Sequence, residues 1–348
     1  MTASQSASMA NQIEIGPIDR LVLLGGGALL VRLAEWAKAS NLSVTVVTSP
    51  RHATEKPSGT GSLTEQLKAQ DIPVMVTESV DSPDVEAFIG SGTKDFCLSL
   101  GAAWIFKTKT IETLFGSGLY NLHGTRLPQD RGGGGFSWQI LMGNRLGYCQ
   151  LHNVDGGVDT GDIVQTEEFI YPPSCRTPAD YSEHYVERSF ALVTKLLSEL
   201  RAGSVTLART TQPHYLSTYW PRLHTDTHGW VDWRWETADL ERFICAFDDP
   251  YGGAQTYLGD KEVRLKSAMA SYHERPFHPF QAGIVFHRTP TWACVATAGG
   301  SLVVERVLDS NGKNILGELR NGDIFSTPSE KLDAARARVA YDASGLVT

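Results

Sequence analysis

The sequence lacks any uninterrupted apolar run of the roughly 20 residues that a membrane-spanning helix needs. Residues 1–17 are small and polar, and they lack the charged and apolar blocks of a secretory signal peptide. We therefore expect a cytoplasmic protein without a membrane partner, beginning with a disordered tail over 1–17.

Cysteines are few and show no pairing pattern. The chain has five, an odd number, and no two of them form a Cys-x-x-Cys motif. This scatter argues against a disulfide framework and against a cysteine-based zinc site, and it is typical of reduced thiols.

An excess of basic charge is also missing. Lysines and arginines number 31 against 39 aspartates and glutamates, which leaves a net charge of −8. Such a balance argues against a dedicated nucleic-acid binder. The 348 residues are 41% hydrophobic, enough for a substantial core and for two domains.

The first half predicts a Rossmann-like α/β domain. Residues 20–24 and 43–48 are apolar and strand-like, with a glycine turn and a helical pattern between them. As a nicotinamide site this turn fails, because Leu30 replaces the third glycine of the fingerprint and no ribose-binding acid follows the second strand. An oxidoreductase remains an alternative that these two absences oppose.

Several short strands separated by turns fill 254–308 and predict a small β-barrel. A terminal helix is expected over 329–341, with Ser329 as a possible N-cap. After the tail, the expected division is a catalytic domain over 18–208, a linker over 209–228 and a C-terminal domain over 229–348.

The stretch 118–164 carries the chemistry. Asn121 and His123 close an apolar run, and in a strand these alternate residues share one face. The later segment from Asp155 to Asp162 is rich in carboxylates and too rich in glycine for a helix. An amide, an imidazole and a carboxylate together suit proton transfer beside a polarised carbonyl.

This stretch resembles the signature of the folate-dependent formyltransferases. The resemblance rests on Asn121-Leu122-His123, Leu127-Pro128, Arg131-Gly132 and the loop from Asp155 to Asp162. It implies a Rossmann-like catalytic domain followed by an OB-like C-terminal domain, with 10-formyltetrahydrofolate as the co-substrate and no metal. It also implies that Asn121, His123 and Asp159 are the catalytic residues.

The resemblance extends to binding residues. Arg131 suits either a substrate anion or a structural ion pair, and we assign Arg131 and Gly132 to the acceptor site. Thr125-Arg126 and the run of glycines at 133–135 depart from the usual pattern there, which bears on acceptor preference. It implies folate contacts from Trp104, Ile105, Phe106, Val154, Asp155, Gly156, Gly157 and Asp162.

Two other kinds of site compete for the same residues. The carboxylates of Asp155, Asp159 and Asp162 suit a hard cation, but the loop lacks the further oxygen ligands of a calcium site. The glycines at 132–135 could cradle a phosphate, but no Gly-Lys-Ser/Thr follows them.

The expected acceptor is the primary amine of an amino-sugar nucleotide used in cell-surface glycan synthesis. The polar loop at 51–61 has only Arg51, His52 and Lys56 as possible cations, whereas a tRNA-binding relative would need a more basic insertion. Methionyl-tRNA and hydroxyornithine remain alternative acceptors. By resemblance to sugar-nucleotide formylases we also expect a homodimer.

Overall fold

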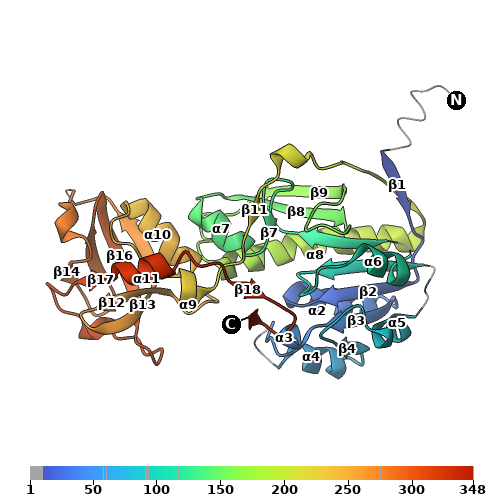
Figure 1. Cartoon of the computed structure of the whole chain (residues 1–348), viewed down its shortest axis with the longest axis horizontal. Coiled ribbons are helices and arrows are strands. Elements are labelled where there is room, and N and C mark those ends of the chain that lie inside the picture. Colours follow the sequence, from blue (N-terminus) through green and yellow to red (C-terminus); the bar gives the residue numbers. More distant parts are fainter. Residues whose placement is uncertain are drawn as a thin grey trace.

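The computed structural model describes residues 11–57, 59, 61–90, 92, 94–116, 118–274 and 276–347. It has two lobes placed end to end, an α/β lobe and a smaller β-rich lobe (Figure 1). None of the helices in these residues is both long and apolar enough to cross a membrane.

A seven-stranded sheet forms the centre of the first lobe. Its first five strands are parallel to one another, and the last two run antiparallel to their neighbours. The order across the sheet is β4 (Val74–Val76), β3 (Ser43–Thr48), β2 (Arg20–Gly25), β5 (Asp95–Leu100), β6 (Leu119–His123), β8 (Leu146–Asn153) and β9 (Ile163–Ile170). This arrangement confirms the predicted Rossmann-like domain.

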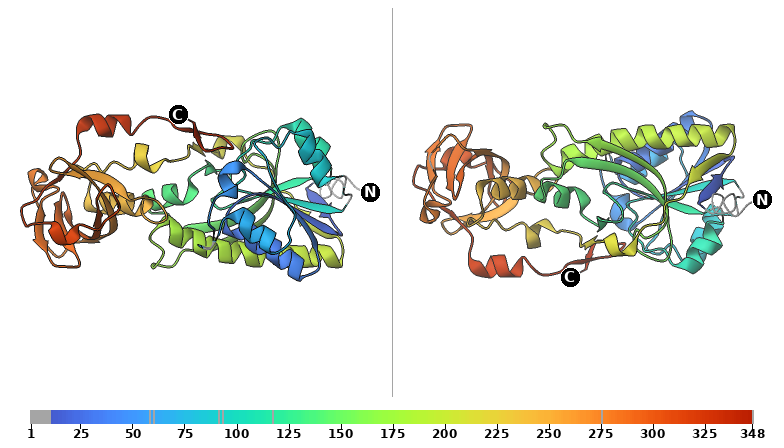
Figure 2. Two further views of the ribbon diagram at one scale, coloured as in Figure 1. Left: turned by 90° about the horizontal axis from the view of Figure 1, so that it is seen from below. Right: turned by 90° about the horizontal axis from the view of Figure 1, so that it is seen from above.

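Alternation along the central strands divides the core between two faces. Leu21 and Leu23 of β2 belong to one buried cluster, whereas Val22 and Leu24 belong to another. Helices α2 (Ala28–Ala39), α4 (Leu63–Ala69) and α8 (Pro178–Ala202) cover the first face, and α5 (Pro83–Ile89) and α6 (Thr108–Leu114) cover the second. Figure 2 shows these two helix layers on opposite sides of the sheet.

The N-terminal segment corrects one prediction. Gln12–Ile15 is not disordered but forms strand β1, which pairs antiparallel with β10 (Val205–Ala208). Alternation of Ile13 and Ile15 explains the difference, because pairing on β10 buries Ile15. The rest of the predicted tail, over 1–10, lies outside the described residues.

The predicted linker and the polar loop at 51–61 also contain short elements. The start of the loop belongs to α3 (Pro50–Ala53), a single helical turn capped by the side chain of Ser49. The linker contains η1 (His214–Leu216), β11 (Tyr219–Trp220) and α9 (Thr225–His228). Strand β11 pairs with β7 (Arg131–Gly132), so the linker lies against the signature motif.

The second lobe is the predicted small barrel. Its antiparallel sheet runs in the order β14 (Val285–Arg288), β15 (Ala293–Thr297), β16 (Gly300–Leu308), β13 (Lys261–Ser271), β12 (Ala254–Leu258) and β17 (Phe325–Ser326). The edges meet, since the amide of Phe325 donates to the carbonyl of Gly283 at 2.9 Å. Helix α10 (Thr237–Ala246) contributes Leu240, Phe243 and Ile244 to the core.

The C-terminal segment differs from the expected helix over 329–341. Helix α11 (Ser329–Ala334) is shorter and begins after Pro328, so Ser329 is not its N-cap. None of its residues is buried, and a short helix without a packed face has little to sustain it. The chain then returns to the first lobe and forms a hairpin of β18 (Ala340–Tyr341) and β19 (Leu346–Val347).

Candidate active site

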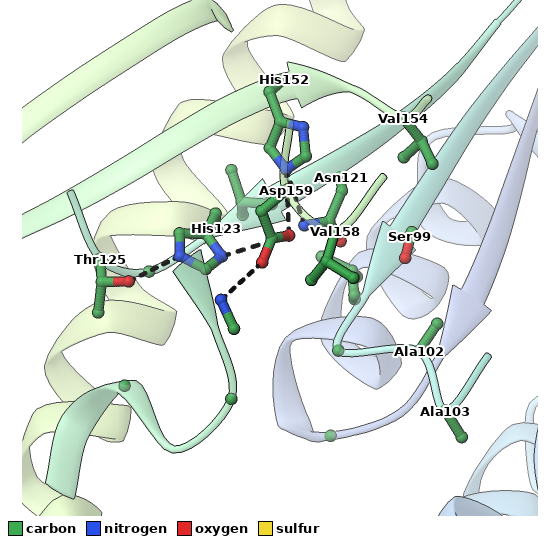
Figure 3. A pocket seen from close by; sticks show the side chains of 18 of the residues that line it. Ser99, Ala102, Ala103, Asn121, His123, Thr125, His152, Val154, Val158 and Asp159 are labelled. Atoms are coloured by element: carbon green, nitrogen blue, oxygen red, sulfur yellow. Dashed lines mark hydrogen bonds and ion pairs between the residues drawn. The ribbon is translucent and has the colours of Figure 1, made fainter. Parts of the chain in front are cut away.

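A pocket of about 530 Å³ opens at the carboxyl ends of β2, β5 and β6, where ligands bind in open α/β sheets. Its walls come from the turn after β2, the segment after β5, the end of β6 and the loop at 155–160. Figure 3 shows Asn121, His123, His152 and Asp159 converging on this pocket.

Strand β6 positions the first two side chains as the sequence predicts. Tyr120 and Leu122 point into the apolar core, and Asn121 and His123 line the pocket. The imidazole of His123 is almost fully buried. The period of two along a strand therefore places an amide and an imidazole together on the pocket side.

Asp159 approaches both histidines of the site from the loop. Its Oδ1 lies 3.7 Å from Nδ1 of His123 and 3.6 Å from Nε2 of His152. Its Oδ2 accepts a hydrogen bond of 3.0 Å from the amide of Gly132. The backbone of Asp159 has a φ of 52°, a left-handed conformation that Asp tolerates better than most side chains.

The pKa of Asp159 is held well below its usual range. Burial of the carboxylate would raise that pKa, but the charge of His123, the nearby His152 and the hydrogen bond from the amide of Gly132 together outweigh burial. Asp159 is therefore ionised at neutral pH and available to stabilise a protonated imidazole.

His123 is held in one tautomer by a backbone carbonyl. Its Nε2 lies 2.7 Å from the carbonyl oxygen of Asp130, which can only accept a hydrogen bond. Nε2 of His123 must therefore carry the proton. In the neutral ring, Nδ1 is then the basic nitrogen, and it faces Asp159. Thr125 Oγ1 lies beside the same pair, 2.7 Å from Nε2, and donates to the same carbonyl.

His152 is a site residue to which the sequence assigned no role. Its Nδ1 lies 2.8 Å from the carbonyl of Asn153, so Nδ1 donates and Nε2 is free to accept. Nε2 lies 3.1 Å from the side-chain nitrogen of Asn121, whose amide it orients. The available signal was strand pairing, because β6 and β8 place His152 directly opposite Asn121.

Most of the expected folate residues line the pocket. Trp104 and Ile105 do so with Phe106, and the Ile105 side chain is 70% exposed. Val154, Asp155 and Gly157 line it from the other side, whereas Gly156 does not.

Asp162 is turned away from the pocket, contrary to the predicted folate contact. Its carboxylate lies 2.7 Å from Nη2 of Arg209. Asp155 accepts from the amide of Gly157 and the hydroxyl of Thr160, which shapes its own loop. Because Asp159 faces the two histidines, the three carboxylates do not converge, and the described residues contain no cluster suited to a metal ion.

Arg131 also differs from the prediction. Its buried guanidinium donates to Oε1 of Gln212, at 2.7 Å from Nη2, and does not line the large pocket. The amide of Gln212 in turn donates to the carbonyls of Asp159 and Gly161. Arg131 therefore supports the loop, while Gly132 does reach the pocket.

Comparison with known proteins finds likenesses to formyltransferases. The family model described as "Formyl transferase, C-terminal domain" matches residues 224–320. The methionyl-tRNA formyltransferase of Acetivibrio thermocellus is 24% identical over 295 residues, which cover 83% of this chain and 91% of that protein. These likenesses support a folate-dependent formyltransferase family for this chain.

Other formyltransferases match over varying lengths. The methionyl-tRNA formyltransferase of Desulfotalea psychrophila is 27% identical over 207 residues, or 60% of this chain. That match spans 62% of the relative, so this chain matches only about three fifths of the length of that protein.

Solved formyltransferase structures share the fold. The sugar 3N-formyltransferase WlaRD, solved with dTDP and 5-N-formyl-THF, has a TM-score of 0.64 at 15% identity and covers 83% of this chain and 97% of its own. The Helicobacter canadensis N-formyltransferase, in complex with folinic acid and dTDP-3-aminofucose, has a TM-score of 0.60 at 17% identity, covering 83% and 99%. These likenesses favour a formyltransferase over the oxidoreductase alternative.

Proposed function

We propose that this formyltransferase moves the formyl group of 10-formyltetrahydrofolate to the primary amine of a nucleotide-linked amino sugar. The observation that carries the proposal is the convergence of Asn121, His123 and Asp159 at one pocket. An amide donor, a base with a defined free nitrogen and an ionised carboxylate are the groups that acyl transfer to an amine requires.

The residues divide the reaction between them. The acceptor nitrogen attacks the formyl carbon, and the side-chain amide of Asn121 donates a hydrogen bond to the oxygen that becomes negative. Nδ1 of His123 takes the proton that the attacking nitrogen loses, and Asp159 stabilises the resulting imidazolium. The bond from the formyl carbon to the folate nitrogen then breaks, and that nitrogen receives the proton.

The pocket also suits a flat, partly apolar folate ring. Ile105 presents an exposed aliphatic side chain to it, and Trp104 and Val154 add apolar surface. The indole of Trp104 is itself held by a hydrogen bond of 3.0 Å from Nε1 to the carbonyl of Glu78. The folate complexes of the two sugar formyltransferases support this assignment.

Charge supports a small acceptor over tRNA. Residues 224–320 contain ten lysines and arginines against thirteen aspartates and glutamates. Phosphate contacts from free basic side chains dominate affinity for nucleic acid, and among the described residues six of these cations are already paired with carboxylates. The six are Arg234, Arg242, Arg264, Lys266, Arg306 and Lys313.

Methionyl-tRNA is the second candidate acceptor. The observation that favours it is that the sequence relatives described above are methionyl-tRNA formyltransferases. Hydroxyornithine stays an alternative with no observation of its own.

The proposal is tested by release of tetrahydrofolate, followed by absorbance. The purified protein is mixed with 10-formyltetrahydrofolate and dTDP-, UDP- or GDP-linked amino sugars, methionyl-tRNA or hydroxyornithine. His123→Asn is the inactive control. Turnover with a sugar nucleotide that the control lacks is the expected result, and turnover with methionyl-tRNA alone would overturn the acceptor assignment. Light scattering on the same sample measures the predicted homodimer.

A further inference from the structure

The last residues of the chain return from the barrel to the pocket lobe. After α11 the segment runs along the outside of the molecule and ends beside α3 (Figures 1 and 2). The carbonyl of Ala337 lies 2.9 Å from Nε2 of His228, and the carbonyl of Ala343 accepts from the amide of Arg51 at 3.2 Å. Ala343 is buried there, so the segment is docked on the first lobe.

The docked end is a small hairpin. Tyr341 on β18 pairs with Leu346 on β19. Asp342 closes the turn, since its Oδ1 accepts from the amides of Ser344 and Gly345 at 2.8 and 3.0 Å. The hairpin therefore holds the Tyr341 side chain in a defined position.

Tyr341 lies against an arginine of the pocket. The guanidinium carbon of Arg222 is 4.9 Å from the centroid of the Tyr341 ring, within the range of a cation–π contact. Arg222 lines the large pocket, and its Cβ lies 3.2 Å from where a side chain at Gly133 would begin. The neighbouring residue Gly132 donates to Asp159, so Arg222 lies along the wall that leads to the catalytic carboxylate.

The charge of Arg222 is not balanced by an ion pair. Within the described parts of the chain, no carboxylate oxygen lies within 4.0 Å of its guanidinium. Arg51 is a second cation close to Arg222. Burial lowers the pKa of Arg51, and the charge of Arg222 lowers it further. Nε of Arg51 is buried and has no hydrogen-bond partner among these residues.

We propose that Arg222, held by Tyr341 of the C-terminal hairpin, binds the diphosphate of the acceptor at the pocket mouth. This inference rests on the proposed function and adds a specificity residue, Arg222, with Tyr341 as a positioning residue that acts through it. The acceptor recognised here is a nucleoside-diphosphate sugar, because a guanidinium with free donors matches phosphate geometry. The hairpin thus makes the end of the chain part of the acceptor site.

The test compares five variants with the wild type: Arg222→Gln, Tyr341→Ala, Tyr341→Phe, Lys331→Ala and a chain ending at Val339. Tyr341→Phe retains the ring. Lys331→Ala removes a similar cation–π contact in the same segment, 4.8 Å over Trp230 and on the barrel. Measured quantities are KM and kcat with the sugar nucleotide that the wild type uses, Kd for dTDP, UDP and GDP, and Kd for 5-formyltetrahydrofolate.

We expect Arg222→Gln to raise acceptor KM and nucleoside-diphosphate Kd by about ten- to a hundredfold, the range for a hydrogen bond to a charged group. Tyr341→Ala and the shortened chain should raise both by about three- to tenfold, the range for a cation–π contact. Tyr341→Phe and Lys331→Ala should match the wild type. In every variant kcat should stay within about twofold and folate Kd should not change, because these side chains contribute to acceptor binding alone. Each tenfold rise in acceptor KM or Kd corresponds to about 1.4 kcal/mol of binding free energy.

Failures of the two proposals are distinguishable. A wild type that formylates a sugar nucleotide, with KM unmoved by Arg222→Gln or Tyr341→Ala, overturns the inference and leaves the proposed function standing. A wild type that formylates methionyl-tRNA alone and binds no nucleoside diphosphate overturns both. A shortened chain with a lower KM would show that the hairpin obstructs the mouth, and it would also overturn the inference.

Discussion

Nδ1 of His123 lies 3.7 Å from Oδ1 of Asp159, while Nε2 of the same ring is engaged 2.7 Å from the carbonyl of Asp130. The carbonyl determines which nitrogen carries the proton in the neutral ring, and the carboxylate faces the nitrogen that remains basic. The pair therefore combines a directed base with a fixed negative charge. Single substitutions at Asn121, Asp159 and His152 can therefore test what each side chain contributes to catalysis.

Asn121→Ala should lower kcat by about two to three orders of magnitude, because a preorganised donor to the developing oxyanion is worth about 3–4 kcal/mol. Release of tetrahydrofolate measures kcat, and fluorescence titration with 5-formyltetrahydrofolate measures retained binding. Asn144→Ala, in the turn before β8, is the matched control and should keep wild-type kcat. An Asn121→Ala variant with unchanged kcat would remove Asn121 from the catalytic residues.

Asp159→Asn should lower kcat by about three to four orders of magnitude, since removing the carboxylate beside a catalytic histidine has that effect in other triads. The loss should be present throughout pH 5 to 8, because the pKa of Asp159 lies well below its usual value and the wild-type carboxylate stays ionised there. A pH–rate profile of both proteins checks this, and a gap that closes as pH falls from 7 to 5 would contradict it.

The same pKa shift predicts a stability effect of defined sign. A carboxylate whose pKa is depressed by folding stabilises the protein above its unfolded pKa of about 3.9, and this contribution is lost as pH falls through the folded pKa. Any stability that Asp159 contributes by ionisation should therefore be constant between pH 5 and 8. Urea denaturation of wild type and Asp159→Asn at pH 5 and 8 should give the same difference in unfolding free energy.

His152→Phe should lower kcat by about ten- to a hundredfold, because it leaves the Asn121 amide without its buried acceptor, at about 1–3 kcal/mol. His152→Gln supplies an oxygen that can accept from Asn121, and it should recover part of the loss. The measurement is kcat for both variants at saturating folate. Equal activity of His152→Phe and wild type would show that His152 only fills space.

His52 should make the protein less stable in mild acid. Burial, with the charges of Arg51 and Arg222, lowers the pKa of His52 to about 4. The unfolded chain takes up this proton near pH 6.5 and the folded chain does not, so stability falls as pH drops from about 6.5 toward 4. The loss between pH 7.5 and 5 should be about 2 kcal/mol.

The check for His52 is urea denaturation at pH 7.5 and 5 on wild type and His52→Gln. The variant lacks the titrating ring and should lose about 2 kcal/mol less than the wild type between these pH values. His184→Gln, which removes a histidine on α8, controls for the general effect of losing an imidazole. Parallel losses in wild type and His52→Gln would show that another group controls the acid response.

Several features of the fold could be predicted because they depend on local periodicity. Apolar runs in β2, β3 and β5 indicate strands buried on both faces, and the helical spacing after the glycine turn indicates α2. Asn121 and His123 share a face for the same local reason. The terminal helix was predicted too long because its sequence favours a helix, while the packing that sustains a helix is absent after Ala334.

Other features depend on which distant segments meet. The composition of the signature suggests that Arg131 faces a substrate, but Gln212, from a segment 81 positions away, accepts its hydrogen bonds. His152 belongs to the site only because β8 pairs with β6 in a register that places it opposite Asn121.

By itself, the sequence determined the two-lobed architecture, the shared face of Asn121 and His123 and the glycine-rich loop that carries Asp159, since each depends on spacing within one segment. Tertiary structure decided the tautomer of His123, the pairing of Asp162 with Arg209 and the docking of Tyr341 on Arg222. Each of these depends on a hydrogen bond, an ion pair or a ring contact between separate segments. The direction of a side chain is set by such contacts, and they exist only after the chain has folded.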